Sequence, residues 1–390
     1  MNFWSTLPRP VIGLSPMDGV TDAGFRSIIA QQGKPDVTFT EFTHVRDVCR
    51  GPARLLETLI YSEIERPMVA QLYGHDPDLF YQAAHAVCEL GFDGLDLNMG
   101  CPSKAVASSG SGAGLIRTPD VAHAIMSATK QGIADWAGGQ RLDQVGFKAA
   151  QIAEFRRLNE QRGGPSPAVR RLLPVSVKTR LGYDAVVVEP WVEHLLREQP
   201  AVISLHGRTL KQMYRGEADW SAIARAAALT KGTGTLLLGN GDVQSLDDAV
   251  ARIWETGVDG VLVGRAVLGA PWFFRLKEQA RALASGPGPQ EGTSCRGEAV
   301  ECDRRFAVLL DHARQFEALF GPGQFHRMRK QLGWYCKGFP HAAALRARMF
   351  RLSSVRELEA LLADYHAHRI LDSVETGPIE DAAMPASRCS

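Results

Sequence analysis

The residues best suited to chemistry follow short apolar runs of the chain. Cys101 comes just after the run at 94–98, and Lys178 and His206 are each the last residue of a run of their own. A thiol in such a place serves as a nucleophile or a general acid. A lysine and a histidine offer a cation and a hydrogen-bond donor to an electron-rich ring. For the other six cysteines we keep the ordinary role of a small buried side chain.

Polar or reactive side chains end nearly every apolar run. Gln71 carries an amide that donates and accepts toward the edge of a heterocycle. Gly241 and Gly264 let the backbone approach a phosphate closely, and Arg265 adds positive charge. The full set is Ser15-Pro16-Met17-Asp18, Glu41, Gln71, Asn98, Lys178, Arg180, His206, Arg208, Asn240-Gly241-Asp242 and Gly264-Arg265.

The elements that must position these side chains alternate between strand-length apolar runs and amphipathic stretches. The runs lie at 11–15, 37–42, 67–72, 94–98, 174–178, 201–206, 235–239 and 260–264. Their β-branched and leucine-rich composition is typical of strands buried on both faces. Eight strand–helix units predict an α/β fold, a (β/α)8 TIM barrel over residues 1–284, although a doubly wound open sheet has the same periodicity.

Helix starts and the phosphate loops support this arrangement. Asp76-Pro77, Thr118-Pro119 and Ser245-x-x-Asp248 each predict a capped helix. In such barrels the loops after strands seven and eight often bind phosphate through backbone N–H groups. Asn240-Gly241-Asp242 and Gly264-Arg265 fall at those two ends, which predicts a phosphorylated cofactor.

Two segments interrupt the alternation. Residues 133–173 form an insertion between the fourth helix and the fifth strand, with a helix predicted at 147–160 and a Gly-Gly-Pro-Ser-Pro run at 163–167. Residues 285–298 are rich in Gly, Pro and Ser and predict a linker. Beyond the linker we expect a small all-helical domain at 299–371 and a loose tail at 372–390.

Composition excludes several classes of protein. With 44 Lys and Arg against 43 Asp and Glu, the net charge of +1 excludes a uniformly basic nucleic-acid binder. No apolar stretch approaches the roughly 20 residues that span a membrane, and the N-terminus has no signal-peptide pattern. The seven cysteines lack C-x-x-C spacing, so neither a zinc site nor a redox dithiol is indicated. We expect a reduced, cytoplasmic protein, with a monomer as the default state.

Nine segments of the chain match those of a known family, and the most specific of them is DLNMGCPSK at 96–104. The other segments are SPMDGVTDAGFR (15–26), VAQLYGHDP (69–77), SGAGLIRTPD (111–120), VSVKTRLG (175–182), HGRTLKQMYRGEADW (206–220), GNGDV (239–243), GRAVLGAPWFF (264–274) and FGPGQFHRMRKQLGWYCKGF (320–339). Together they cover roughly residues 11–355. On these segments, the sequence resembles the bacterial tRNA-dihydrouridine synthase family.

The resemblance implies an FMN-dependent reductase that converts uridines of the tRNA D-loop to 5,6-dihydrouridine, with NADPH as reductant and no metal. It implies Cys101 as the proton donor and Asn98 as a contact of the target uracil. Further substrate contacts are expected at Lys104, Arg180 and Arg208. The residues implied to bind FMN are Pro16, Met17, Asp18, Gln71, Lys178, His206, Asn240, Gly241, Asp242, Gly264 and Arg265.

These roles suit the reaction. A hydride that reaches C6 of uracil leaves enolate-like charge on C5 and O4, so an acid on the opposite face must protonate C5. A thiol at Cys101 is suitably placed, and Lys178 would stabilise an anionic reduced ring. Because the uracil must leave the tRNA stack, at a cost of a few kcal/mol, a module that holds the tRNA is expected.

The C-terminal helices are predicted to be that module. No acidic residue lies between Glu317 and Glu357, whereas Trp334 and Tyr335 stand among cations, which suits phosphate contact and base stacking. A core position for Trp334 remains equally open. The cations are Arg327, Arg329, Lys330, Lys337, Arg346, Arg348 and Arg351, of which we expect Arg327, Arg329 and Lys330 to contact tRNA. The insertion is also net basic, and it either adds an RNA contact or only decorates the barrel.

Two other functions remain open on the residues alone. An FMN barrel that reduces a small molecule, such as a dihydroorotate or an enone, would use the same phosphate site together with Cys101 and Lys178, but it leaves the basic helices unexplained. A non-catalytic tRNA-binding protein on the same barrel would have no need of either residue. The choice of D-loop uridine and the preference for NADPH over NADH are not readable from the sequence.

Overall fold

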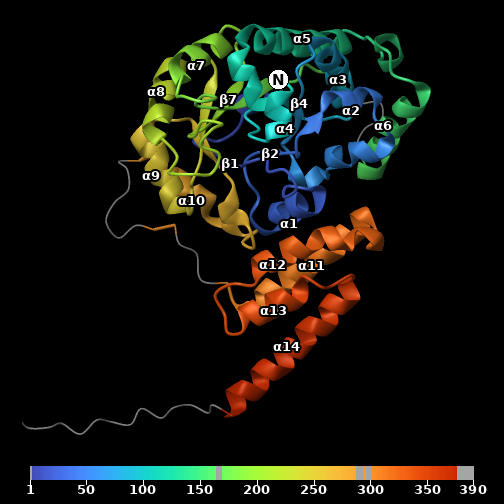
Figure 1. Ribbon diagram of the computed structural model, residues 1–390, viewed down its shortest axis with the longest axis vertical. Coiled ribbons are helices and arrows are strands. Elements are labelled where there is room, and N and C mark those ends of the chain that lie inside the picture. The colour runs from blue at the N-terminus through green and yellow to red at the C-terminus, as the bar shows by residue number, and fades with distance from the viewer. Residues whose placement is uncertain (1, 164–168, 287–293, 296–299, 376–390) are drawn as a thin grey trace, which may run out of the picture. The chain divides into compact units, whose positions relative to one another are not determined.

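A computed structural model describes residues 2–163, 169–286, 294–295 and 300–375, with side chains up to residue 367 (Figure 1). The chain divides into two compact units, residues 1–299 and 300–390, and each is described by itself. Most of the sequence predicted as a linker, and the tail beyond residue 375, lie outside the described residues.

The first unit is built around a parallel sheet whose strands follow the order β1-β9-β8-β7-β6-β5-β4-β2, with β3 also paired to β4. Each predicted run contains a strand, but in the run at 37–42 only the two residues of β2 are strand, and a further short strand, β3, begins just beyond the run at Thr43. The strands are β1 Val11–Leu14, β2 Thr38–Phe39, β3 Thr43–His44, β4 Met68–Tyr73, β5 Gly94–Met99, β6 Val175–Arg180, β7 Val202–His206, β8 Leu236–Asn240 and β9 Gly260–Val263.

Backbone hydrogen bonds between the first and last members of this order close the sheet into a barrel. The Leu14 amide donates to Val37 O, and the Asp36 amide donates to Ile12 O, both at 3.0 Å. The helices surround the strands on all sides (Figure 1). The (β/α)8 barrel is therefore confirmed, and the open-sheet alternative is wrong.

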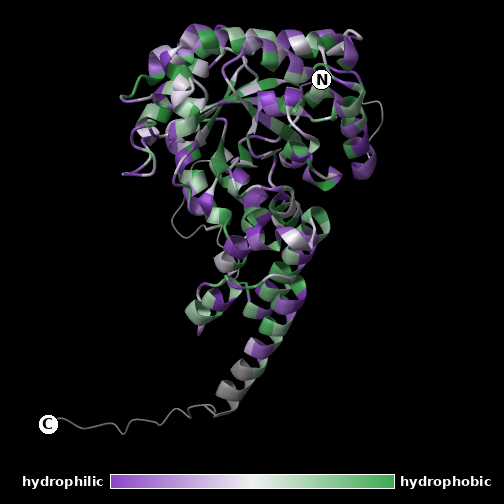
Figure 2. Ribbon diagram, turned by 45° about the vertical axis from the view of Figure 1, so that its right-hand side comes forward, coloured by the Kyte–Doolittle hydropathy of each residue, from purple (hydrophilic) through white to green (hydrophobic). Residues whose placement is uncertain are grey.

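The helices of the barrel unit carry both hydrophilic and hydrophobic residues, as expected of helices that cover a buried sheet (Figure 2). The α-helices are α1 Ala23–Gly33, α2 Val45–Arg50, α3 Pro77–Glu89, α4 Lys104–Ser108, α5 Pro119–Ala137, α6 Ala149–Arg162, α7 Val188–Leu196, α8 Trp220–Thr230, α9 Leu246–Thr256 and α10 Lys277–Ser285. The 3₁₀ helices are η1 Phe3–Ser5, η2 Ala53–Leu59, η3 Glu63–Glu65, η4 Gly112–Arg117, η5 Leu142–Val145, η6 Arg265–Val267 and η7 Phe273–Leu276.

Two of the three predicted caps form as expected. Asp76 Oδ1 accepts from the Asp78 amide at 3.1 Å at the start of α3, and Ser245 Oγ accepts from the Asp248 amide at 3.1 Å at the start of α9. Thr118 makes no side-chain cap bond, so that capping prediction is wrong although α5 does begin at Pro119.

The insertion begins later than predicted, because α5 continues through Ala137 instead of ending near Gly132. Its own helix, α6, occupies residues 149–162 rather than 147–160. Residues 164–167 of the Gly-Gly-Pro-Ser-Pro run lie outside the described residues. Segments that join a barrel helix to the next strand lie at the amino-terminal end of the barrel, away from the end that carries active sites.

The described part of the second unit consists of helices and the segments that connect them. Its helices are α11 Cys302–Phe320, η8 Pro322–Met328, α12 Arg329–Tyr335, α13 Ala342–Met349 and α14 Val355–Glu375. Since α14 runs to Glu375, residues 372–375 are helical and not part of a loose tail. Among the described residues, no helix is long and apolar enough to cross a membrane, and no cluster of His, Cys, Asp and Glu could hold a metal ion.

Candidate active site

A pocket of about 660 Å³ opens at the carboxyl ends of the barrel strands. The barrel topology brings there side chains that are far apart in the sequence, from β4, β5, β6, β7 and β8 and from the loops after β1 and β9. Fourteen of the predicted site residues line it: Pro16, Met17, Asp18, Gln71, Asn98, Cys101, Lys178, Arg180, His206, Arg208, Asn240, Gly241, Asp242 and Arg265.

Two predicted residues of the barrel lie outside the lining. Gly264 is adjacent to it, because a Cβ on Gly264 would stand 3.6 Å from Met17 Sδ. Lys104 is the first residue of α4 and is exposed. The predicted substrate contact at Lys104 therefore has no support from the pocket geometry.

The pocket also contains residues that sequence reasoning missed. Phe42 follows the broken second strand, and Met213 and Tyr214 belong to the loop after β7, where Tyr214 is 65% exposed. Met213 and Tyr214 lie within the segment 206–220 that resembles the family, and this match could have identified them as pocket residues. Glu41, which was expected at the same strand ends, is buried but does not line the pocket.

Cys101 is held by the side chain that precedes it at the end of β5. Asn98 Oδ1 accepts from the backbone amides of Gly100 at 3.1 Å and Cys101 at 2.8 Å. Burial raises the pKa of the Cys101 thiol, although Arg180 and Lys178 oppose this. The thiol therefore keeps its proton at neutral pH, as a proton donor must.

The polar wall beside Cys101 is positively charged. Burial, together with the charge of Arg180, lowers the pKa of Lys178 to about 8. Burial and the neighbouring cations Lys178 and Arg180 also lower the pKa of His206 well below its usual value, so its imidazole is neutral. No described carboxylate forms an ion pair with Lys178 or Arg180. This wall is suited to an anionic or electron-rich group.

Asp242 organises the predicted phosphate end of the pocket. Its carboxylate accepts from Arg208 Nη2 at 2.6 Å, from Arg265 Nη2 at 3.0 Å and from the Ala218 amide at 2.9 Å. Asp242 has a φ of 52° and Gly241 a φ of 133°, so the turn occupies the backbone region that favours glycine. Both carboxylate oxygens of Asp242 are thus engaged by donors of the protein, one of which is Arg265.

Arg180 and Arg208 line the pocket, but their guanidinium groups also bind the protein itself. Arg180 Nε donates to Gly100 O at 2.7 Å and Nη1 donates to Thr209 O at 3.2 Å. Arg208 Nη2 donates to Gly216 O at 2.5 Å in addition to its bonds with Asp242. Both side chains are buried, and they tie together the loops that frame Cys101 and the phosphate end.

The second unit corrects two expectations about its basic segment. Tyr335 is fully buried with its hydroxyl 3.1 Å from His312 Nδ1, so it belongs to the core and is not a base-stacking residue. Trp334 is half-buried. Arg348 pairs with Asp364 at 2.7 Å, which supplies the counter-charge that the sequence between 317 and 357 lacks.

The three predicted tRNA contacts of this unit have different surroundings. Arg327 lies over the rings of Phe320 and Phe316, at 5.0 and 5.8 Å from the ring centres. Arg329 Nε donates to Leu352 O at 2.7 Å, and of the three only Lys330 is exposed.

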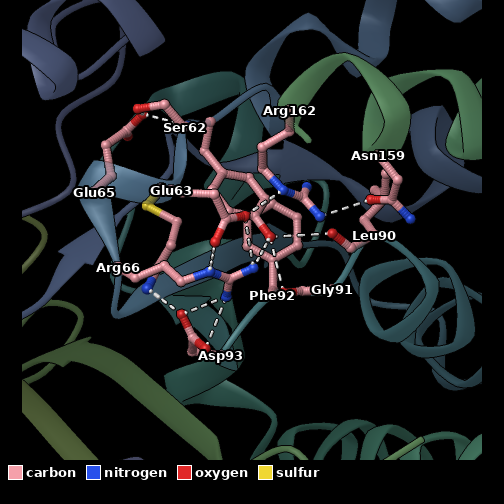
Figure 3. Close-up of polar contacts among 12 residues, drawn as sticks. Ser62, Glu63, Glu65, Arg66, Leu90, Gly91, Phe92, Asp93, Asn159 and Arg162 are labelled. Atoms are coloured by element: carbon pink, nitrogen blue, oxygen red, sulfur yellow. Dashed lines mark hydrogen bonds and ion pairs between the residues drawn. The ribbon is translucent and has the colours of Figure 1, made fainter. Parts of the chain in front are cut away.

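Two basic residues of the insertion, Arg162 and Arg171, pair with carboxylates of the barrel, and Figure 3 shows the surroundings of Arg162. Arg162 Nε donates to Glu63 Oε1 at 2.8 Å, and its guanidinium lies over the Tyr61 ring at 4.2 Å. Arg66 Nε bonds the same Glu63 carboxylate at 2.6 Å, and Arg66 Nη1 bonds Asp93 at 2.9 Å.

Further contacts fix both ends of the insertion. Asn159 Nδ2 donates to Glu89 O at 2.6 Å, and Arg171 Nη2 donates to Asp93 Oδ1 at 2.9 Å. Arg170 donates to Trp136 O and lies over the Trp136 ring. This packing favours the interpretation of the insertion as a decoration that braces the barrel, rather than as an RNA contact.

Comparison with known proteins finds one matching family model and several proteins of similar sequence. The family model "Dihydrouridine synthase (Dus)" matches residues 13–135 and 167–372. A probable tRNA-dihydrouridine synthase of Staphylococcus aureus (strain COL) is 34% identical over 371 residues, which are 94% of this chain and 96% of that protein. Probable tRNA-dihydrouridine synthase 2 of Bacillus subtilis (strain 168) is 34% identical over 379 residues, 96% of this chain and 99% of that protein.

Among solved structures, morphinone reductase in complex with tetrahydroNAD aligns with 75% of this chain and 92% of its own, at 15% identity and a TM-score of 0.37. The family match instead spans most of both units, and it leaves out only the insertion and the chain's two ends. The chain therefore belongs to the dihydrouridine synthase family.

Proposed function

We propose that the pocket at the strand ends binds FMN and a uracil base of tRNA, and that the enzyme reduces that uridine to 5,6-dihydrouridine at a D-loop position with NADPH as reductant. The observation that carries this proposal is the meeting, in one pocket, of a protonated Cys101 thiol with Lys178 and the neutral His206. A reductase of a carbon–carbon double bond needs a proton donor beside a site for an electron-rich ring.

The pocket suits a flat phosphorylated cofactor. Its volume of about 660 Å³ lies within the range of about 300–1,000 Å³ common for cofactor sites. At one end, Gly241, Gly264 and Arg265 offer backbone approach and a cation for a phosphate. At the other end, Lys178 and Gln71 offer a cation and an amide to the polar edge of a ring. When bound, FMN supplies the hydride chemistry of the reaction.

The protein contributes binding, orientation and the proton. Asn98 Nδ2 retains one N–H beyond its bond to Gln71, and this donor can bind a uracil carbonyl in the pocket. The proton of Cys101 Sγ passes to uracil C5 while C6 receives the hydride, so the C5=C6 double bond becomes single. Lys178 stabilises the negative charge that develops on the ring system next to it.

The exposed cations of the second unit support the tRNA-binding part of the proposal. Lys330, Arg346 and Arg351 are exposed, and within the described part of the chain none of them forms an ion pair. Cations without carboxylate partners are available for phosphates of the tRNA backbone. Family membership argues against both the small-molecule reductase and the non-catalytic binder that the residues alone left open.

The test is dihydrouridine content mapped by position with mass spectrometry, after unmodified tRNA is incubated with the purified protein, FMN and NADPH. We expect dihydrouridine at a D-loop position and a yellow, NADPH-reducible protein. A yellow protein that NADPH reduces but that leaves every uridine unchanged would contradict the proposal. NADH in place of NADPH, at matched concentrations, tests the reductant separately.

A further inference from the structure

Asp96 lies inside the barrel on β5, fully buried, and does not itself line the pocket. Its Oδ2 accepts from Gln71 Nε2 at 2.8 Å, and its Oδ1 accepts from Ser176 Oγ at 2.6 Å. An ionised carboxylate can only accept hydrogen bonds. Gln71 must therefore turn its amide nitrogen, and not its oxygen, toward Asp96.

The orientation of the Gln71 amide determines the orientation of the next side chain, Asn98. With its nitrogen on Asp96, Gln71 presents Oε1 to Asn98 Nδ2, at 3.0 Å. Asn98 in turn presents Oδ1 to the backbone amides of Gly100 and Cys101. A side-chain amide works in this series in only one of its two flipped orientations. The donor-to-acceptor direction of the hydrogen bonds is thus set at Asp96 and kept as far as the backbone amide of Cys101.

Other contacts keep the series rigid without setting its direction. Thr40 Oγ1 accepts from the Gln71 backbone amide at 2.9 Å, which fixes the main chain of β4 but not the amide flip. Burial raises the pKa of Asp96 to about 6, so its carboxylate remains ionised at neutral pH. The carboxylate is therefore the one fixed acceptor at the start of the series.

We propose that Asp96 is a positioning residue for uridine reduction, which orients Gln71 and Asn98 and thereby the loop that carries Cys101. The inference rests on the proposed roles of Asn98 and Cys101. It assigns Asp96 mainly to the step that uses tRNA, because reduction of the flavin by NADPH needs neither the uracil contact nor the thiol and depends, within this series, only on Gln71.

The experiment measures the two half-reactions of the FMN-loaded enzyme separately. In Asp96→Leu, which removes the acceptor, we expect the single-turnover rate of dihydrouridine formation from pre-reduced enzyme to fall about 10²-fold, as is common when a reacting group is misplaced. The rate of flavin reduction by NADPH should fall by less than about tenfold, because Asp96 affects the flavin site only through Gln71. Asp96→Asn also loses the charge but can still accept from Gln71, with its amide nitrogen on Ser176 Oγ, so its tRNA step should stay within about tenfold of wild type.

Asp36→Asn is the matched control for a purely structural loss. Asp36 is also a buried carboxylate, bonded to the Ile12 amide at 2.7 Å and to Arg281 at 2.5 Å, and it does not line the pocket. We expect this variant to melt at a lower temperature with the ratio of its two half-reaction rates unchanged. If Asp96→Leu behaves in the same way, Asp96 is only structural and the inference is wrong.

A second variant keeps the test decisive if Asp96→Leu fails to fold. In Asp96→Asn with Ser176→Ala, the new amide nitrogen loses its acceptor, so the tRNA step should fall by more than the product of the two single effects. If the effect of the double substitution on this rate equals the product of the two single effects, the inference is wrong. If wild type forms no dihydrouridine in the same assay, the proposed function fails instead, and the two failures are thus distinguished.

Discussion

The pocket wall and the insertion are both rich in cations, but they differ in what surrounds those cations. In the insertion, Arg157 pairs with Glu154 at 2.6 Å, and this hydrogen bond raises the pKa of Arg157. In the pocket, burial without a paired carboxylate lowers the pKa of Arg180 to about 10 and that of Lys178 to about 8. Net positive charge in a segment therefore does not by itself mark a binding site. Buried cations that have no ion-pair partner are a better mark of a binding site.

The largest effect is expected at the pocket, from Cys101→Ala. Removing the proton donor should lower the rate of dihydrouridine formation by about 10²–10⁴-fold, the usual range for a lost general acid. FMN content, tRNA affinity and flavin reduction by NADPH should persist, because they do not use the thiol. Mass spectrometry of the tRNA and stopped-flow absorbance of the flavin measure the two parts, and wild-type turnover in this variant would remove Cys101 from its role.

The charge of Lys178, which forms no ion pair among the described residues, predicts a pH dependence of FMN binding. With a pKa of about 8 in the free protein, Lys178 loses its proton as the pH rises through 8, so affinity for the electron-rich edge of the ring should weaken at higher pH. We expect the FMN dissociation constant, from flavin fluorescence quenching, to rise up to about tenfold between pH 7 and 9. In Lys178→Met this slope should vanish, while Lys148→Met, at an exposed lysine of the insertion, should retain it.

The second unit and the insertion are also expected to differ in tRNA binding, because the insertion joins a barrel helix to the next strand and so lies at the end of the barrel away from the pocket. Lys330→Ala with Arg351→Ala removes two exposed cations, and it should raise the apparent KM for tRNA severalfold at moderate salt. It should also flatten the slope of log affinity against log salt by about one for each lost phosphate contact. Lys148→Ala with Arg156→Ala, the equivalent change in the insertion, should leave both quantities at the wild-type values. Equal effects of the two pairs would show that the insertion also binds tRNA.

The smallest effect on activity is expected from Arg162→Ala. Arg162 is nearly buried and bonded to Glu63, so its loss should destabilise the protein by about 1–3 kcal/mol, measured by urea unfolding of the holoenzyme. Arg141→Ala, at an exposed ion pair with Asp143, should cost less than about 1 kcal/mol. Unchanged stability in Arg162→Ala would contradict the interpretation that the insertion braces the barrel.

The sequence was sufficient to predict the barrel and most of its pocket, because parallel strands bring their carboxyl ends to one edge. Gln71, Lys178 and Asn240 are far apart in the chain, yet all three line the pocket. Likewise, Asp76 before Pro77 marks a helix start by local chemistry alone.

What sequence reasoning could not provide are contacts between elements. The hydrogen bond from Gln71 to Asp96 joins neighbouring strands, and no pattern in the sequence of either strand predicts it. The fully buried position of Tyr335 depends on how α11 and α12 pack. The pairing of Arg348 with Asp364 depends on a carboxylate beyond the segment in which charges were counted.

The most direct test of the account is a single turnover of pre-reduced, FMN-loaded enzyme with unmodified tRNA, with dihydrouridine counted per flavin. We predict about one dihydrouridine per flavin in wild type and in the Arg156→Ala variant of the insertion. On the same timescale, Cys101→Ala should give almost none. Full product from Cys101→Ala, or loss of product from Arg156→Ala, would contradict the claim that the chemistry belongs to the pocket and not to the insertion.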